Sequence, residues 1–306
     1  MEAITTFEGH RAPVYVLAAG ADEAHFISGS GDGLVAEWDL ADPAKGRGLS
    51  QVTEAVFAAL VMPTHQLLII GTEGGSLHVV DLLDRAEKHR FTVHRKGIFA
   101  LLALDADRFA CAGGDGLLSI WQALPATENG PRCILLRQFP LVEEKLRGLA
   151  LEPGGGQLAV ACGDGSVRLL DTTLFNEHLT LDAHAGGASS VAYHPTKPVL
   201  FSGGKDGHLR AWAVEEGYRE VLALPAHRAA IYGLAFLADG SLLASAGRDK
   251  AVKIWNGADL SPVARHERGT GGHTHSVNAV LWMGETLLSA GDDRVIRAFR
   301  PNAQKG

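Results

Sequence analysis

The chain contains 306 residues, of which 46% are hydrophobic, and its formal net charge of −7 argues against nucleic-acid binding, which requires a basic face. Its three cysteines form no C-x-x-C pair, and such a sparse, odd set is typical of a reducing compartment. The opening residues MEAITTFEG contain no apolar segment of a signal peptide, and the longest apolar run, residues 55–62, is far too short to span a membrane. We therefore expect a cytoplasmic protein with no membrane contact.

In chain order, the sequence is a succession of short apolar runs separated by Gly, Asp and Lys turn residues, and each run is typical of a β-strand. A short segment, residues 2–7, precedes the first complete unit, residues 10–39, which opens with a His and closes with a Trp-Asp dipeptide. The second unit, residues 52–81, is degenerate, because Gly74 replaces the turn Asp and Val80 replaces the Trp.

The third unit, residues 94–121, has Cys111 where other units have Ser. A long insertion rich in Pro, Gly and polar residues, residues 123–132, follows it. We expect this insertion between a third and a fourth strand, on the face opposite the His-bearing turns. The fourth unit, residues 142–171, retains Asp164 but has apolar residues at the His, Ser and Trp positions.

The fifth and sixth units, residues 181–213 and 224–256, are complete. The seventh unit, residues 273–299, ends in Phe299 instead of Trp. The Gly-rich stretch before it, residues 268–272, is predicted to be a flexible loop.

The units repeat at a nearly constant spacing. In three of them a His stands 28 positions before the closing Trp, in the pairs His10 and Trp38, His184 and Trp212, and His227 and Trp255. The closing positions of all seven units are 41 to 49 residues apart, at Trp38, Val80, Trp121, Leu170, Trp212, Trp255 and Phe299. With this period and the Gly-His to Trp-Asp pattern, residues 9–299 resemble the WD-repeat β-propeller family.

The resemblance implies an all-β fold in which residues 1–306 form a single domain, a seven-bladed β-propeller of four-stranded antiparallel blades. The N-terminus has one strand to spare, and the last unit lacks its fourth strand. Residues 2–7 should therefore pair as the outer strand of the last blade, because this closes the ring and removes an open edge. WD-repeat propellers close their rings in the same way.

The resemblance also assigns a buried chain of hydrogen bonds, from Asp to His, from His to Ser or Thr, and from that hydroxyl to the Trp indole N–H. The chemistry is consistent, since an indole N–H can only donate and a hydroxyl both donates and accepts. Units two and four lose His, Ser and Trp together, which leaves no polar partner stranded. The residues assigned to this structural network are His10, Ser28, Asp32, Trp38, His94, Asp115, Trp121, His184, Ser202, Asp206, Trp212, His227, Ser245, Asp249, Trp255, His273, Ser289 and Asp293.

Catalysis is not predicted. Recurring Ser, His and Asp resemble the content of a hydrolase triad, but the set recurs in several units and includes Trp, so a structural role explains it better. The chain has no G-x-S-x-G or Walker motif. We predict no cofactor and no metal, although the loop that carries His266, Glu267, His273 and His275 leaves a metal site open as the alternative to a polar loop.

The innermost strand of each unit is almost wholly apolar, with isolated polar residues at Arg147, Ser189, Ser190 and Asn278. These strands carry no paired carboxylates and no His cluster, as an enzyme working in the central channel would require. An enzyme or small-molecule sensor that uses the channel is therefore the alternative, and a non-catalytic protein-interaction scaffold is the main interpretation.

Partners of the resembled family usually bind the face that carries the His turns. Acidic residues expected on this face include Glu73, Glu143, Glu144 and Asp292. The partner-binding residues predicted there are basic, and they are Arg11, Arg95, Lys96, Lys145, Lys205, Arg228 and Arg248. Such an arc suits a protein or peptide partner that is acidic or phosphorylated, with ordinary solvated charge as the alternative. We expect the protein to be a monomer.

Overall fold

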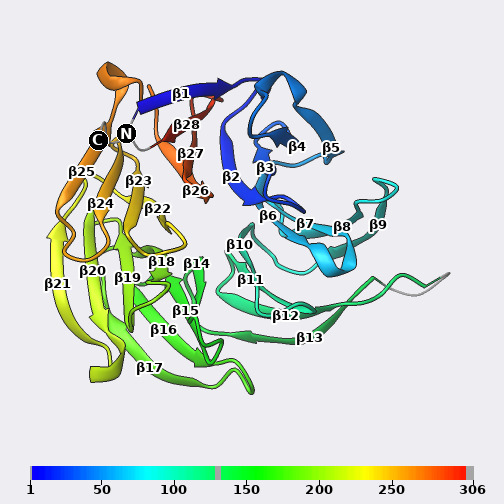
Figure 1. The fold of residues 1–306 in the computed structure, drawn as a ribbon. Helices are drawn as coiled ribbons and strands as arrows, with labels where there is room; N and C mark the ends of the chain where they lie inside the picture. Colours follow the sequence, from blue (N-terminus) through cyan, green and yellow to red (C-terminus); the bar gives the residue numbers. More distant parts are fainter. Residues whose placement is uncertain (1, 128–131, 301–306) are drawn as a thin grey trace.

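Seven four-stranded antiparallel sheets stand in a ring in the computed structural model, which describes residues 2–127 and 132–300 and, for residues 2–4, the backbone alone (Figure 1). The predicted seven-bladed architecture is confirmed. In each of the first six blades the four strands follow one another in sequence, from the innermost strand to the outermost. None of the helices in the described ranges is long and apolar enough to cross a membrane.

The strand bounds follow the seven units. The first blade consists of β2 (Val14–Ala19), β3 (His25–Ser30), β4 (Leu34–Asp39) and β5 (Arg47–Gln51). The second consists of β6 (Val56–Met62), β7 (Leu67–Thr72), β8 (Ser76–Asp81) and β9 (Glu87–Thr92). The third consists of β10 (Ile98–Ala103), β11 (Arg108–Gly113), β12 (Leu117–Ala123) and β13 (Cys133–Pro140).

The later blades repeat this order. The fourth consists of β14 (Leu146–Leu151), β15 (Gln157–Cys162), β16 (Ser166–Asp171) and β17 (Glu177–Asp182). The fifth consists of β18 (Ala188–Tyr193), β19 (Val199–Gly204), β20 (His208–Ala213) and β21 (Arg219–Pro225). The sixth consists of β22 (Ile231–Phe236), β23 (Leu242–Gly247), β24 (Val252–Asn256) and β25 (Pro262–His266). The seventh consists of β26 (Val277–Met283), β27 (Thr286–Gly291), β28 (Ile296–Arg300) and β1 (Glu2–Phe7).

The connections contain four short 3-10 helices, η1 (Pro43–Lys45), η2 (Pro63–His65), η3 (Val214–Glu216) and η4 (Arg268–Thr270). The predicted flexible loop at residues 268–272 therefore begins with one helical turn. The turn between the second and third strands of a blade requires a left-handed residue, as at Gly116, whose φ is +79°. A Cβ on Gly116 would lie 1.9 Å from the carbonyl oxygen of Val142, so any larger residue would displace the loop that leads into the fourth blade.

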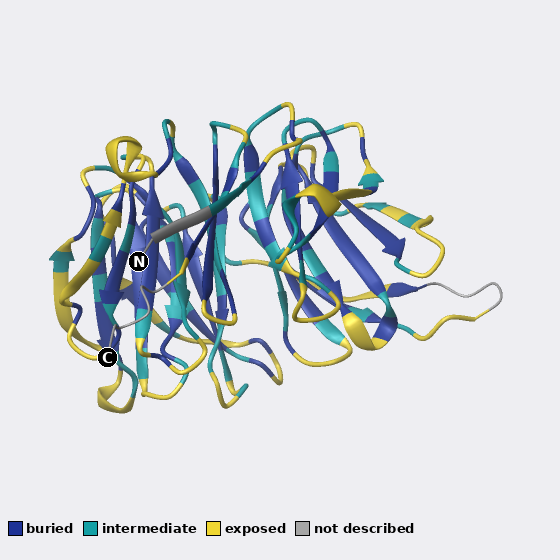
Figure 2. Cartoon of the chain, turned by 45° about the horizontal axis from the view of Figure 1, so that its top comes forward, coloured by how far each residue is buried: buried dark blue, intermediate teal, exposed yellow. Residues whose placement is uncertain are grey.

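The core is divided into apolar layers between neighbouring blades. Second strands such as β7 are buried along their whole length, because blades cover both of their faces, and their sequences are therefore apolar without alternation. Outer strands such as β9 are largely exposed and polar. In the layer between the second and third blades, Ile69 and Leu77 pack with Phe109 and Trp121. Figure 2 shows the buried residues within the blades and the exposed residues on the turns and outer strands.

The insertion at residues 123–132 lies between β12 and β13, as predicted, although residues 128–131 fall outside the described ranges. Its last residue, Arg132, is buried and forms an ion pair with Asp81. Arg132 also donates to the carbonyl oxygen of His65 at 2.6 Å. These contacts attach the base of the insertion to the second blade.

The N-terminal strand closes the ring. β1 pairs antiparallel with β28, from Glu2 opposite Arg300 to Phe7 opposite Ile296. The ring of Phe7 is buried, and its centroid lies 5.0 Å from that of Phe26 in the first blade. One strand therefore completes the last blade while its final residue packs into the first.

Deleting residues 1–8 should lower the melting temperature and cause self-association. The deletion leaves β28 with an open edge and exposes the apolar surface that Phe7 covers. Melting and size-exclusion chromatography measure both effects. A control that lacks residues 302–306, which lie outside the described ranges, should behave like the parent, and an N-terminal deletion that melts and elutes like the parent would contradict closure by β1.

Candidate protein-interaction face and channel mouth

A hydrogen-bond network joins two connections on the same face of each complete blade. In the sixth blade, His227 Nδ1 donates to Asp249 at 2.9 Å, and His227 Nε2 lies 2.7 Å from the hydroxyl of Ser245. Trp255 Nε1 donates to the same hydroxyl at 2.9 Å. His227 precedes the innermost strand β22, whereas Asp249 lies in the turn between β23 and β24. The network therefore ties the entry loop of the blade to this turn.

The first and fifth blades repeat the arrangement with the residues expected from the sequence, His10, Ser28, Asp32 and Trp38 in one and His184, Ser202, Asp206 and Trp212 in the other. In the first blade His10 Nδ1 stands 3.6 Å from Asp32, an ion-pair distance longer than a hydrogen bond. The serine hydroxyls of these networks are fully buried, and each accepts from a Trp indole. A substrate cannot reach them, so they are structural groups rather than nucleophiles.

The third blade builds the same network with a serine on a different strand. His94 Nδ1 donates to Asp115 at 2.9 Å, but His94 Nε2 pairs with Ser119 at 3.2 Å, and Trp121 Nε1 donates to Ser119 at 3.0 Å. Ser119 lies on β12 directly opposite Cys111 on β11, where the other complete blades carry their serine. The sequence analysis missed Ser119, although a serine facing the vacant position across the strand pair was the available signal.

In the seventh blade, His273 Nδ1 donates to Asp293 at 2.7 Å, and His273 Nε2 lies 2.8 Å from Ser289. Phe299 occupies the Trp position and is stacked with His266 at a centroid distance of 4.4 Å. His275, the third histidine of this loop, contacts Thr274 instead. These histidines do not converge, and across residues 2–127 and 132–300 no group of three or more metal-ligating side chains is present.

The second blade corrects one expectation. The loss of His, Ser and Trp was expected to leave this unit without polar partners, but Thr72 donates to the carboxylate of Glu54, and the Gly74 amide donates to it at 3.2 Å. The hydrogen bond from Thr72 lowers the pKa of Glu54 most, which keeps the carboxylate charged. Glu54 thus ties the entry loop to the turn in place of a histidine.

The fourth blade has no such histidine, and its Asp164 accepts from Ser166 Oγ at 2.7 Å. Arg168 on β16 joins this aspartate, at 3.4 Å, to Glu177, at 2.9 Å, on the outer strand β17. Val142, Val160 and Leu170 fill the His, Ser and Trp positions, as the sequence indicates.

The network aspartates also fix the backbone of the cation-bearing loops. The second carboxylate oxygen accepts from the amide after the histidine, from Arg228 at 3.1 Å, Arg11 at 2.7 Å and Arg95 at 2.9 Å. The side chains of these residues point away from the network and are exposed.

The seven predicted cations all lie on this face. Six are exposed and Lys145 is half-buried, and among the described residues none of the seven forms an ion pair; they are Arg11, Arg95, Lys96, Lys145, Lys205, Arg228 and Arg248. Six of them run without interruption over blades three to six, whereas Arg11 stands apart on the first blade. Burial lowers the pKa of Lys145, and the charges of Arg147, Lys205 and Lys96 lower it further against the opposing effect of Glu144.

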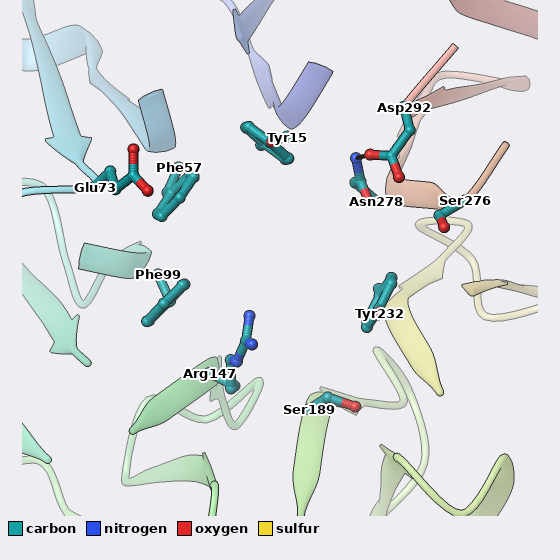
Figure 3. A pocket seen from close by; sticks show the side chains of 10 residues that line it. All are labelled: Tyr15, Phe57, Glu73, Phe99, Arg147, Ser189, Tyr232, Ser276, Asn278 and Asp292. Carbon is teal, nitrogen blue, oxygen red and sulfur yellow. Dashed lines mark hydrogen bonds between the residues drawn. The ribbon is translucent and has the colours of Figure 1, made fainter. Parts of the chain in front are cut away.

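Every innermost strand contains one extra residue near this face, at the same place in each blade, where the pairing with the second strand shifts by one residue. Such β-bulges redirect a side chain, here into the mouth of the central channel (Figure 3). The seven bulge residues are Tyr15, Phe57, Phe99, Arg147, Ser189, Tyr232 and Asn278. With Glu73, Ser276 and Asp292 they line a cavity of about 550 Å³. The sequence analysis treated three of them as isolated polar exceptions and missed the aromatic ones.

One side of the mouth is an arc of stacked rings. Tyr15 meets Phe57 edge-on at 5.1 Å, and Phe57 stacks on Phe99 at 5.4 Å with an interplanar angle of 12°. The guanidinium of Arg147 lies 4.3 Å from the centroid of Phe99, which is a cation–π contact. These contacts join the first four blades at the channel.

On the other side, two bulge residues join neighbouring blades by hydrogen bonds. Ser189 donates to the carbonyl oxygen of Ile231 at 2.5 Å. Asn278 donates to Val14 O at 3.0 Å and to Asp292 at 2.8 Å.

Ser119→Ala should lower the free energy of unfolding by about 1–3 kcal/mol, because His94 and the Trp121 indole lose their buried partner. Adding Cys111→Ser, which places a hydroxyl where the complete blades have theirs, should restore part of this loss. Urea unfolding of the parent, both single variants and the double variant measures the coupling. Effects that simply add would contradict the shared network.

The carboxylate of Asp249 should make the protein sensitive to acid. Burial raises its pKa, but hydrogen bonds from His227 and from the Arg228 and Ala251 amides outweigh burial and lower the pKa to about 2. Because this value lies below the unfolded pKa, Asp249 contributes about 2 kcal/mol at neutral pH, and this contribution is lost as pH falls from about 4 to about 2. Urea unfolding across this range should show a shallower acid dependence for Asp249→Asn than for the parent. An unchanged dependence would contradict the assignment.

Comparison with known proteins supports the repeat assignment. The WD40 family model (WD domain, G-beta repeat) matches residues 1–39, 175–213 and 218–256. The 66 kDa stress protein of Physarum polycephalum is 25% identical over 96% of this chain and 47% of its own length, and WD repeat-containing protein 1 of Gallus gallus is 24% identical over 97% and 48%. The U3 small nucleolar RNA-associated protein 15 homolog of Gallus gallus is 24% identical over 81% and 44%. The chain thus spans less than half the length of these relatives.

The crystal structure of the WD40 β-propeller domain of Doa1 superposes with a TM-score of 0.84, at 16% identity, over 99% of this chain and 97% of that chain. At this identity the similarity shows the fold alone. Three matched repeats, WD-repeat relatives along nearly the whole chain and seven blades in a ring lead to one conclusion: the chain is a WD-repeat protein that folds as a seven-bladed β-propeller.

Proposed function

We propose that this propeller is a non-catalytic scaffold that binds an acidic or phosphorylated segment of a protein partner on its cation-bearing face. WD40 propellers are generally protein-interaction scaffolds, but the fold hosts many functions, so the surface has to supply the argument.

The unpaired cations over blades three to six carry this proposal. Elsewhere basic side chains on the strands are matched by carboxylates, as in Arg210 with Glu220 at 2.6 Å and Arg265 with Glu267 at 2.7 Å. Six cations without such partners, on a protein with a net charge of −7, concentrate positive potential on one surface. Carboxylate and phosphate groups are the natural complement of this potential.

A small-molecule sensor is the second candidate, and the cavity of about 550 Å³ at the channel mouth favours it. The two functions differ in what stabilises the protein. A sensor shows a thermal shift with one specific small molecule, because a ligand stabilises the state that it binds. A scaffold captures a protein partner without any small molecule.

The charge-reversed variant Lys96→Glu/Lys205→Glu/Arg248→Glu should keep its melting temperature and lose the partner identified by affinity capture and mass spectrometry. Exposed charges contribute little to folding, whereas their reversal repels an acidic segment. Capture by the parent should also weaken with salt, since charges are screened beyond about 10 Å at 0.1 M.

The matched control reverses three exposed cations on the opposite face, Lys45, Lys197 and Arg219. It introduces the same change in net charge and should retain the partner. Undiminished capture by the first variant, or equal loss in both, would return the cations to ordinary solvated charge.

A further inference from the structure

The channel mouth carries unpaired charges of both signs on opposite sides. Arg147 projects into the cavity from the fourth blade, and Glu73 and Asp292 reach it from turns of the second and seventh blades (Figure 3). None of the three forms an ion pair within the described part of the chain. The opposite charges therefore face one another across the cavity without neutralising one another.

The positive side is held in place and is not freely solvated. Arg147 is half-buried with its guanidinium on the face of Phe99, and no acceptor among residues 2–127 and 132–300 receives its N–H groups. Lys145 lies 6.0 Å from the centroid of the same ring. Burial lowers the pKa of Arg147, which shows that the surroundings offer its charge less than water does. An anionic group at this position would receive several donors from two cations.

The negative side is organised around Tyr15. Burial raises the pKa of Tyr15, and the charges of Asp292 and Glu73 raise it further, so both carboxylates act on this hydroxyl. Asn278 donates to one oxygen of Asp292 at 2.8 Å, which fixes that carboxylate at the rim. A cationic side chain placed over Tyr15 would meet two carboxylates and the face of an aromatic ring.

The distance between the two sides suits a short extended peptide. From Tyr15 to the Arg147 guanidinium the arc takes three steps, of 5.1, 5.4 and 4.3 Å. An extended chain advances about 3.3–3.6 Å per residue, so three or four residues cover this arc. The apolar faces of Phe57 and Phe99 lie beneath the middle of the path.

We propose that the channel mouth binds an extended peptide segment in one direction, with an anionic side chain against Arg147 and Lys145 and a basic side chain, three or four residues away, against Glu73 and Asp292. This assignment rests on the proposed function, because it specifies which segment of a protein partner occupies the face. The anionic group is a carboxylate or a phosphate.

The test uses four fluorescein-labelled heptapeptides with an alanine and glycine background. Two carry a glutamate followed three residues later by a lysine or the same residues in reverse order, and two carry phosphoserine in place of the glutamate. Fluorescence anisotropy with the whole chain measures each Kd. One order should bind at least about five-fold more tightly than its reverse, because peptides of equal composition differ only in which end meets which charge. The stronger of the glutamate and phosphoserine pairs identifies the source of the anion, and either result supports the proposal.

The variant Glu73→Lys/Arg147→Glu exchanges the charges across the mouth and should abolish or invert the preference for one order. The control Lys197→Glu/Glu285→Lys makes the same exchange between exposed residues on the opposite face and should retain the preference. Melting temperatures establish that both variants are folded. Equal affinity for the two orders, or a preference that survives the exchange at the mouth, would overturn the proposal.

This outcome is separable from that of the proposed function. The exchange leaves Lys96, Lys205 and Arg248 in place, and the charge reversal of those three leaves Arg147 and Glu73 in place. Loss of partner capture by the charge-reversed variant, together with no preference for peptide order, would retain the scaffold and reject the oriented mouth.

Discussion

A single carboxylate joins two connections in most blades, and the cation-bearing face depends on it. In the sixth blade Asp249 accepts from the ring of His227 and from the backbone of Arg228, so the loop that enters the blade and the turn at its middle move as one piece. The histidine is buried against a serine that also accepts from a tryptophan. A fully satisfied buried network of this kind is rigid, because breaking any bond leaves an unpaired polar group. The cations that follow the histidines are therefore presented on a fixed backbone.

The same requirement is met by different residues in different blades. The third blade moves the hydroxyl from β11 to Ser119 on β12, and the second replaces the histidine by Glu54. In each case the donors and acceptors are matched, although the residue types differ. Hydrogen-bond satisfaction constrains the geometry of the site and not the identity of each residue. This explains how a repeat can lose its signature residues and still form a regular blade.

The channel mouth depends on the ring as a whole. Each bulge residue comes from a different blade, and their contacts run from one blade to the next, through Tyr15 and Phe57 on one side and through Ser189 and Asn278 on the other. Closure by β1 keeps the seventh blade beside the first, which holds Asn278 against the backbone of Val14. The surface that we propose for partner binding and the strand that closes the ring are thus mechanically connected, because separation of the first and last blades would open the mouth.

The sequence by itself determined the number of blades, the closing role of residues 2–7, and the members of the networks in the complete units. It could do so because strand length, turn residues and the spacing from His to Trp are local or periodic properties of the chain. Only the tertiary structure decided that Ser119 serves the third blade, that Glu54 serves the second, and that seven bulge residues meet at the channel mouth. Ser119 was hidden because the partner of a residue on one strand is chosen by pairing with another. The mouth was hidden because a bulge turns one side chain out of the alternating pattern, and its neighbours come from positions more than forty residues apart.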